Sequence, residues 1–337
     1  MLLSRTAEDL YWLGRHMERA ESLARVVGEH TALLVDLPVD VESDWGALLA
    51  ITGSNEPFAE RYDRSGEDEI VTFLLADVGH PGSLVRSVNS ARESLRVTRQ
   101  LVPRSAWECL NDLHRTASQD AAACTSRTQR MTVVDTVIGT CQQFSGILDG
   151  TMNRDHAYRF WELGRLMERA DMTTRVLDVR AGTLMDSETP PAHPPADRSP
   201  YEHVRWLGVL RCVAGQHMYQ RSSSTSVEGD GVVSFLLEDE HFPRSVAHCT
   251  NRITALLADL PRRSAPRRAT VALRQQLAAR SAGRTDARQL HAQLDAIQVS
   301  LADLHVAVDD SYFTVEHIAA ANLRQLEHVA DLTAPTG

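Results

Sequence analysis

One eight-residue segment occurs twice in this chain with a single change. LGRHMERA, from Leu13 to Ala20, recurs as LGRLMERA from Leu163 to Ala170. A second match follows in the same order, because TFLLADVGHPGSL, which starts at Thr72, aligns with SFLLEDEHFPRSV, which starts at Ser234. Internal repeats decide an architecture, since each copy is expected to fold as the same unit. The sequence therefore predicts one building block present twice.

The repeat also predicts how the chain divides. We expect residues 1–150 to form the first copy and residues 151–337 the second, with both packed as one compact unit. The Pro-rich stretch 188–200 has the composition of a domain linker. In the repeat alignment it falls where the shorter segment 37–44 falls in the first copy. We therefore interpret it as a loop inside the second copy.

Apolar residues recur at helical spacing along the chain. The stripe near the N-terminus comprises Leu10, Leu13, Met17, Ala20, Ala24 and Val27, and its repeat comprises Phe160, Leu163, Met167, Ala170, Thr174 and Leu177. A last segment carries Leu290, Leu294, Ile297, Leu301, Leu304 and Val308 at heptad spacing, followed out of phase by Val315, Leu323 and Leu326. Its counterpart in the first copy is the stretch from Ser105 to Asp149. No run alternates as a strand does.

Long helices with such stripes pack as bundles. The predicted fold class is therefore all-α: a helical bundle of long antiparallel helices formed by two pseudo-symmetric tandem repeats. Within it, Pro81 and Pro243 each precede an apolar stripe, and we expect each to lie in the first turn of a helix. The repeated Pro-x-Ser places Ser83 and Ser245 where helix caps are needed.

Charge and composition exclude several classes of function. A formal net charge of −10 leaves no basic surplus to neutralise phosphates, so nucleic acid is not an expected partner. No apolar run reaches the length of a membrane-spanning helix, and the N-terminus lacks the core of a signal peptide. The 5 cysteines are scattered and never form a C-x-x-C pair, which is typical of reduced thiols. We expect a cytoplasmic protein without a membrane partner.

The chain contains no lysine, because all 35 of its basic residues are arginine. A Walker A loop, a Schiff-base lysine and a lysine general base are therefore excluded. The histidines show no H-E-x-x-H and no Cys/His zinc spacing, and no nucleophile elbow is present. We expect neither a cofactor nor a metal, and we assign no catalytic residue. The sequence leans against an enzyme without excluding one.

One charged group is retained where most of the two copies differ. It has the form Arg-x-x-Glu-Arg, and its members are Arg15, Glu18, Arg19, Arg165, Glu168 and Arg169. Arg15 lies three residues before Glu18, so the two can pair on a helix. Gly14 costs a helix about 1 kcal/mol relative to Ala. Because Gly164 repeats it, we expect another backbone to approach closely there.

Two interpretations of this group remain open. The first is structural, with Glu and Arg side chains joining neighbouring helices through ion pairs. The second is a functional anion site, in which guanidinium groups hold a phosphate or carboxylate and a glutamate positions them.

LGR-x-MERA, repeated mid-chain and followed each time by FLL and Pro-x-Ser, resembles the alpha-E family, a helical domain with an ER motif that is usually duplicated. The ER pairs here are Glu18–Arg19 and Glu168–Arg169, and the resemblance covers essentially the whole chain. Family members occur with circularly permuted ATP-grasp ligases, transglutaminase-like proteins and an NTN-hydrolase-type peptidase. The resemblance therefore implies an ATP-grasp protein, a transglutaminase-like protein, or both, as partners.

This company implies a peptide or protein modification system in which amide bonds are made and cut. Our leading hypothesis is a non-catalytic helical partner or substrate-presenting subunit built around an ATP-grasp amide ligase. The first alternative is an enzyme, or a half-site, for amide-bond chemistry that uses the paired Arg-Glu-Arg groups. The second is a general helical interaction scaffold.

Overall fold

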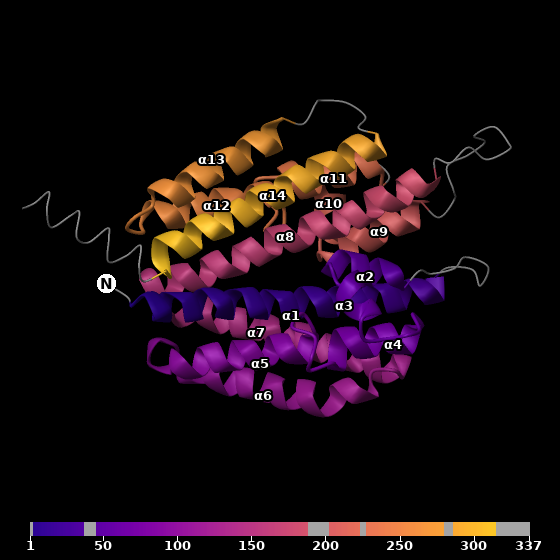
Figure 1. Cartoon of the computed structure of the whole chain (residues 1–337), viewed down its shortest axis with the longest axis horizontal. Helices are drawn as coiled ribbons and strands as arrows, with labels where there is room; N and C mark the ends of the chain where they lie inside the picture. The colour runs from indigo at the N-terminus through magenta and orange to yellow at the C-terminus, as the bar shows by residue number, and fades with distance from the viewer. Residues whose placement is uncertain (1–2, 37–44, 188–201, 223–226, 280–285, 315–337) are drawn as a thin grey trace, which may run out of the picture.

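The computed structural model describes residues 3–36, 45–187, 202–222, 227–279 and 286–314. Within these ranges the chain is all-α and contains no strand, which confirms the predicted fold class (Figure 1). No helix in this part of the chain is both long enough and apolar enough to cross a membrane.

The helices follow one another in two series. The first comprises α1 (Ser4–Asp36), α2 (Gly46–Thr52), α3 (Asn55–Ala59), α4 (Glu67–Val71), the π-helical η1 (Thr72–Ala76), α5 (Leu84–Val97), the short η2 (Arg99–Leu101), α6 (Arg104–Asp120), the short η3 (Ala121–Ala123) and α7 (Arg127–Thr151). The second comprises α8 (His156–Ser187), α9 (Glu202–Cys212), α10 (Gln216–Ser222), α11 (Gly229–Glu238), α12 (Val246–Ala258), α13 (Ser264–Ala278) and α14 (Ala287–Tyr312).

Two long helices, α1 and α8, lie side by side at the centre and share the most extensive helix–helix contact (Figure 1). α5, α6 and α7 lie on the side of α1, and α12, α13 and α14 lie on the side of α8. Contacts also cross between the groups, because α2 packs on α8 and α9 packs on α1. The seam between α1 and α8 is therefore the central contact of the fold.

Helix direction differs from the predicted antiparallel bundle at this central seam. Within each group neighbours run antiparallel: Phe160 at the start of α8 packs on Tyr312 at the end of α14. α1 and α8 instead run in the same direction, since Gly14 meets Trp161 and Glu18 meets Arg169. The helices between them return the chain to its starting end, as long crossover connections do. The antiparallel expectation is wrong for this pair.

The predicted apolar stripes form the core. No residue of the α1 and α8 stripes is more than 4% exposed, and Leu290 to Val308 of α14 are buried at heptad spacing. Burial of such stripes supplies the main favourable free energy of folding. The continuation at Val315, Leu323 and Leu326 lies outside the described residues.

The two Pro-x-Ser segments cap helices through serine. Ser83 Oγ accepts a hydrogen bond from the Arg86 N–H at 3.2 Å, and Ser245 Oγ accepts one from the His248 N–H at 3.0 Å. Both serines are N-caps with extended backbone, which satisfies one otherwise free donor in each first turn. The capping prediction is confirmed. The prolines lie before the caps, so their predicted place in the first turn is wrong.

The region from Ser105 to Asp149 is two helices, because η3 and the turn before Arg127 interrupt it. α7 ends at Thr151 and α8 begins at His156, which puts a chain reversal at the predicted boundary near residue 150. The Pro-rich loop 188–200 lies outside the described residues. The division into two copies stays a prediction.

Candidate functional site

Two glycines sit where α1 and α8 approach most closely. A Cβ added to Gly14 would overlap the carbonyl oxygen of Trp161 and lie 2.8 Å from the Arg165 nitrogen. A Cβ added to Gly164 would overlap the carbonyl oxygen of Tyr11. Only a residue without a side chain allows this approach. The expected close backbone contact is present at both positions.

The Glu168 carboxylate is held by two arginines of α1. Arg15 Nε donates to Oε2 at 2.7 Å, while Arg19 donates through Nε to Oε1 at 2.5 Å and through Nη2 to Oε2 at 3.0 Å. The Glu168 side chain is only 2% exposed. Both oxygens are thus occupied by charge-assisted hydrogen bonds, the strong kind in proteins.

The Glu18 carboxylate makes the reciprocal contact. Arg169 of α8 donates through Nε to Oε1 at 2.9 Å and through Nη2 to Oε2 at 2.7 Å. Arg244, in the turn before α12, donates to Oε1 of Glu18 at 2.6 Å and to Oε1 of Glu21 at 2.6 Å. The two ER pairs therefore cross, each glutamate binding the arginine of the other pair.

Of the six predicted residues, Arg165 stands apart. Its Nη1 lies 3.6 Å from an oxygen of Asp149, its guanidinium lies 4.6 Å from the centre of the Trp161 ring, and its Nε is buried without a hydrogen-bond partner. The expected pair between Arg15 and Glu18 does not form, because Arg15 turns across the seam to Glu168.

The ion pairs change the acidity of both glutamates. Burial alone would raise the pKa of Glu18, but Arg169 and Arg244 outweigh it and lower that pKa to about 2. Burial acts likewise on Glu168, and Arg15 and Arg19 lower its pKa to about 2. A carboxylate with such a pKa stays ionised at neutral pH and is a poor proton acceptor or donor there.

The cysteines are also unsuited to chemistry. All five are free, and four are buried. Burial raises the pKa of Cys109 and Cys124 to about 11 and that of Cys212 and Cys249 to about 12, and it raises the pKa of Cys141 well above its usual value. Thiols in this state are protonated near neutral pH, and the thiolate is the nucleophile.

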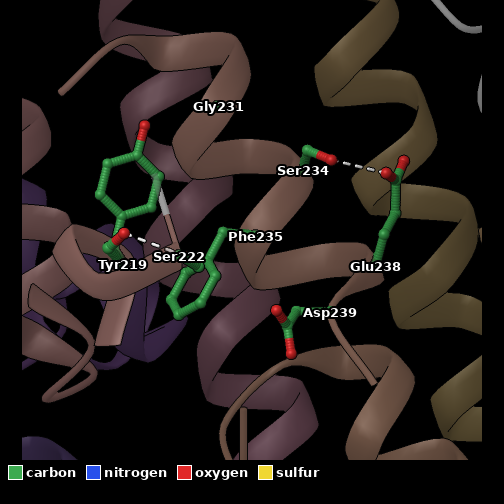
Figure 2. Close-up of a pocket in the computed structure, with 7 residues that line it drawn as sticks. All are labelled: Tyr219, Ser222, Gly231, Ser234, Phe235, Glu238 and Asp239. Atoms are coloured by element: carbon green, nitrogen blue, oxygen red, sulfur yellow. Dashed lines mark hydrogen bonds between the residues drawn. The ribbon is translucent and has the colours of Figure 1, made fainter. Parts of the chain in front are cut away.

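Among the hollows on the described surface are two that are lined by none of the six predicted residues. One, of about 350 Å³, lies beside α10 and α11 (Figure 2). There Ser234 donates to Glu238 at 2.6 Å, and one oxygen of Asp239 accepts from the N–H groups of His241 and Phe242. The other, of about 460 Å³, lies between α1 and α5 and is lined by Trp12, His16 and Arg86 among others.

The ion pairs at the α1–α8 seam include two residues, Arg244 and Glu21, that the sequence analysis did not predict. Arg244 occupies the middle position of the second Pro-x-Ser, where the first has Gly82. That difference was a usable signal, because it adds a charge to an otherwise matched turn. Glu21 lies three residues after Glu18 and binds Arg25 as well as Arg244. No spacing rule distinguishes it from an ordinary surface i,i+4 pair.

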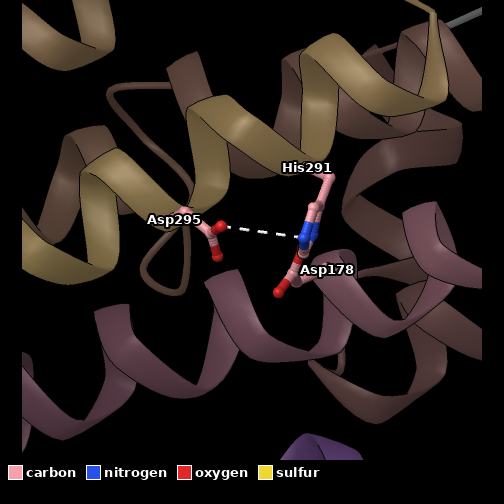
Figure 3. Close-up of side chains that lie close together, drawn as sticks. All are labelled: Asp178, His291 and Asp295. Atoms are coloured by element: carbon pink, nitrogen blue, oxygen red, sulfur yellow. Dashed lines mark hydrogen bonds and ion pairs between the residues drawn. The ribbon is translucent and has the colours of Figure 1, made fainter.

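A cluster of three titratable side chains lies between α8 and α14. Asp178, His291 and Asp295 each offer one ligand atom within 4.8 Å of the other two (Figure 3). The sequence expectation of no metal site does not consider this group, since Asp178 and His291 are separated by 113 positions.

The repeated ER residues lie in the central seam between α1 and α8. The comparison with protein families also points to an ER motif. Residues 2–313 match the model of Alpha-E, described as a predicted alpha-helical domain with a conserved ER motif. The chain belongs to the Alpha-E family. In Alpha-E terms, the ER residues of this member are Glu18–Arg19 and Glu168–Arg169.

Curated relatives of this Alpha-E chain include uncharacterized proteins of Mycobacterium bovis and of Mycobacterium tuberculosis. Each is 25% identical over 279 residues, which is 76% of this chain and 30% of the relative. The chain thus spans about a third of the length of these relatives. No solved structure matches this chain.

Proposed function

We propose that this chain is a non-catalytic helical partner in a peptide or protein modification system, where it docks onto an ATP-grasp amide ligase or presents the ligase's substrate. The observation that carries the proposal is that the ER residues are buried in ion pairs between α1 and α8. Glu18 and Glu168 each bind arginines from across the α1–α8 seam and are buried there. Buried carboxylates that are paired in this way support a role in joining helices.

The relatives supply a second support. This chain corresponds to 30% of the length of the mycobacterial proteins, so in them an Alpha-E region shares a polypeptide with much additional sequence. A helical unit that lies beside other regions in one chain fits the role of a partner. The ATP-grasp and transglutaminase-like partners come from the family resemblance.

Co-expression tests the proposal directly. The chain is produced with an affinity tag beside an untagged circularly permuted ATP-grasp protein from the same genome, and the complex is measured by native mass spectrometry. We expect a complex of defined stoichiometry that withstands purification. An Alpha-E chain that remains alone at micromolar concentrations of both proteins would contradict the proposal.

Surface variants locate the contact. Val299 and Val306 lie seven residues apart on α14, which places them on one face of the helix, and they are 61% and 57% exposed. Val299→Glu combined with Val306→Glu is expected to weaken the complex while the thermal midpoint is kept. Val97→Glu at the end of α5, where the side chain is 45% exposed, is the matched control. A complex that the α14 variant leaves unchanged would place the contact outside α14.

The enzyme alternative makes the opposite prediction for the ER residues. If Glu168 took part in amide-bond chemistry, Glu168→Gln would abolish turnover and leave the melting temperature almost unchanged. The ion pairs with Arg15 and Arg19 argue for the reverse, a lowered melting temperature. Measuring both quantities on one protein preparation decides between the two.

A further inference from the structure

A cluster of three side chains lies where α8 packs on α14, apart from the ion pairs of the ER residues. Asp178 belongs to α8, and His291 and Asp295 lie one turn apart on α14. Figure 3 shows the imidazole between the two carboxylates. The His291 Nδ1 lies 2.5 Å from an oxygen of Asp178, and its Nε2 lies 3.6 Å from an oxygen of Asp295.

The short contact fixes the roles of the two ring nitrogens. Nδ1 lies at hydrogen-bond distance from Asp178, so it carries a proton and donates it to the carboxylate. In a neutral imidazole Nε2 is then the nitrogen with the lone pair, and it faces Asp295. A lone pair directed at a carboxylate is unfavourable unless a proton or a metal ion lies between them.

The separation of Nε2 and the Asp295 oxygen suits a metal ion. Bonds of about 2.1 Å from Zn²⁺ to nitrogen and oxygen put two ligands about 3.0 to 3.6 Å apart at angles of 90 to 120°. The observed 3.6 Å lies at the upper end of that range. Asp178 supplies the common outer partner, because a histidine that binds a metal usually donates its other N–H to a carboxylate.

We propose that Asp178, His291 and Asp295 form a binding site for a divalent transition-metal ion of the Zn²⁺ type. His291 Nε2 and an oxygen of Asp295 are the ligands, and Asp178 orients the imidazole. The His291 and Asp295 side chains are 42% and 56% exposed, so the remaining coordination positions face water or a group of another molecule. An imidazole with few oxygens suits Zn²⁺ better than Mg²⁺ or Ca²⁺.

The competing arrangement is a protonated imidazole that bridges two carboxylates. The hydrogen bond that the imidazole donates to Asp178 raises the pKa of His291, which favours that proton. A proton and a metal ion therefore compete for Nε2, and metal affinity is the quantity that separates the two arrangements.

Isothermal titration of the untagged full chain with ZnCl2, after removal of metals and in the presence of a phosphine reductant that offers no thiolate ligand, tests the proposal. We expect one Zn²⁺ per chain with a dissociation constant in the micromolar range, and no heat with MgCl2. His291→Ala and Asp295→Asn are each expected to weaken Zn²⁺ binding at least tenfold. His217→Ala, which removes an exposed histidine from α10, is the control and should leave the binding unchanged.

Three results would overturn the site. They are no Zn²⁺ binding at 100 µM, equal binding in the wild type and His291→Ala, or equal loss in His217→Ala. Asp295 is more than half exposed, so Asp295→Asn is expected to keep the fold, and its circular dichroism and melting temperature check this. The isolated chain suffices for every measurement. Failure here therefore leaves the proposed association with a ligase untouched, and the reverse also holds.

Discussion

Glu18 and Arg169 form a two-point ion pair across the α1–α8 seam, with hydrogen bonds of 2.9 and 2.7 Å between residues 151 positions apart. Arg19 and Glu168 form the reciprocal pair. Because each glutamate is buried, its charge is balanced by arginine rather than by bulk water. Each pair joins one residue of α1 to one residue of α8. Together the two pairs fix the register of α1 against α8.

Glu18→Gln should destabilise the fold by about 3–5 kcal/mol, because it leaves Arg169 and Arg244 buried without their shared counter-charge. Urea denaturation followed by circular dichroism measures the loss. Glu108→Gln is the control: Glu108 pairs with Arg104 within α6, and its side chain is 56% exposed. Its effect should stay within about 0.5 kcal/mol. Equal effects for both variants would show that the seam pairs are dispensable.

Acid should destabilise the protein through the same carboxylates. The pKa of Glu18 and of Glu168 is about 2 in the folded chain, against 4.5 as the usual value. A lowered folded-state pKa means that the unfolded chain binds protons more readily. The stabilisation is therefore complete above pH 4.5 and is lost as the pH falls towards 2. We expect the urea midpoint to fall steeply over this window.

Glu168→Gln serves as the comparison in that titration. The variant lacks one of the two titrating carboxylates, so its stability should depend less on pH between 4.5 and 2. Parallel pH profiles for variant and wild type would mean that Glu168 titrates normally in the folded chain.

Sequence reasoning reached the helices and the ER residues for a physical reason. Apolar stripes at 3.6-residue spacing indicate which face of a helix is buried. A glycine present at both Gly14 and Gly164 indicates that another backbone approaches closely at these positions. Both are local signals. The partner of Arg15 is not local, since it depends on how α8 lies beside α1, and that arrangement was predicted with the wrong direction.

The same limit explains the other omissions. The π-helical turn η1 begins at Thr72 in a segment whose apolar spacing is that of an ordinary helix. Asp178 and His291 meet only because α14 returns antiparallel along α8. Residues that meet only through the packing of helices far apart in the sequence have no characteristic spacing from which the contact could be predicted.

Arg130 of α7 should be the most important arginine outside the ER network. It is fully buried and donates to the carbonyl oxygen of Cys124 at 2.8 Å, to Glu67 at 2.9 Å and to Thr31 Oγ1 at 3.2 Å. Arg130→Met is expected to cost about 3 kcal/mol, because the buried carbonyl oxygen of Cys124 and the buried hydroxyl of Thr31 lose their donor. Denaturant unfolding measures the change.

Arg127 provides the matched control for Arg130. It binds the same carboxylate, that of Glu67, at 2.7 Å, but its side chain is 55% exposed. Arg127→Met should cost less than about 1 kcal/mol, because water replaces the lost partner. Similar costs for the two variants would mean that burial of the Arg130 guanidinium does not matter.

The glycines at the seam give the sharpest test of the central packing. Gly164→Ala places a methyl group on the carbonyl oxygen of Tyr11, and Gly14→Ala places one on that of Trp161. Backbone atoms cannot rotate away as a side chain can, so α1 and α8 must separate, at a cost of about 3 kcal/mol. Gly139→Ala and Gly146→Ala on α7 meet nothing within 4 Å and should instead stabilise the chain by about 0.5–1 kcal/mol. Opposite signs in one denaturation series would separate close packing from helix propensity; stabilisation by Gly164→Ala would show that the helices do not approach this closely.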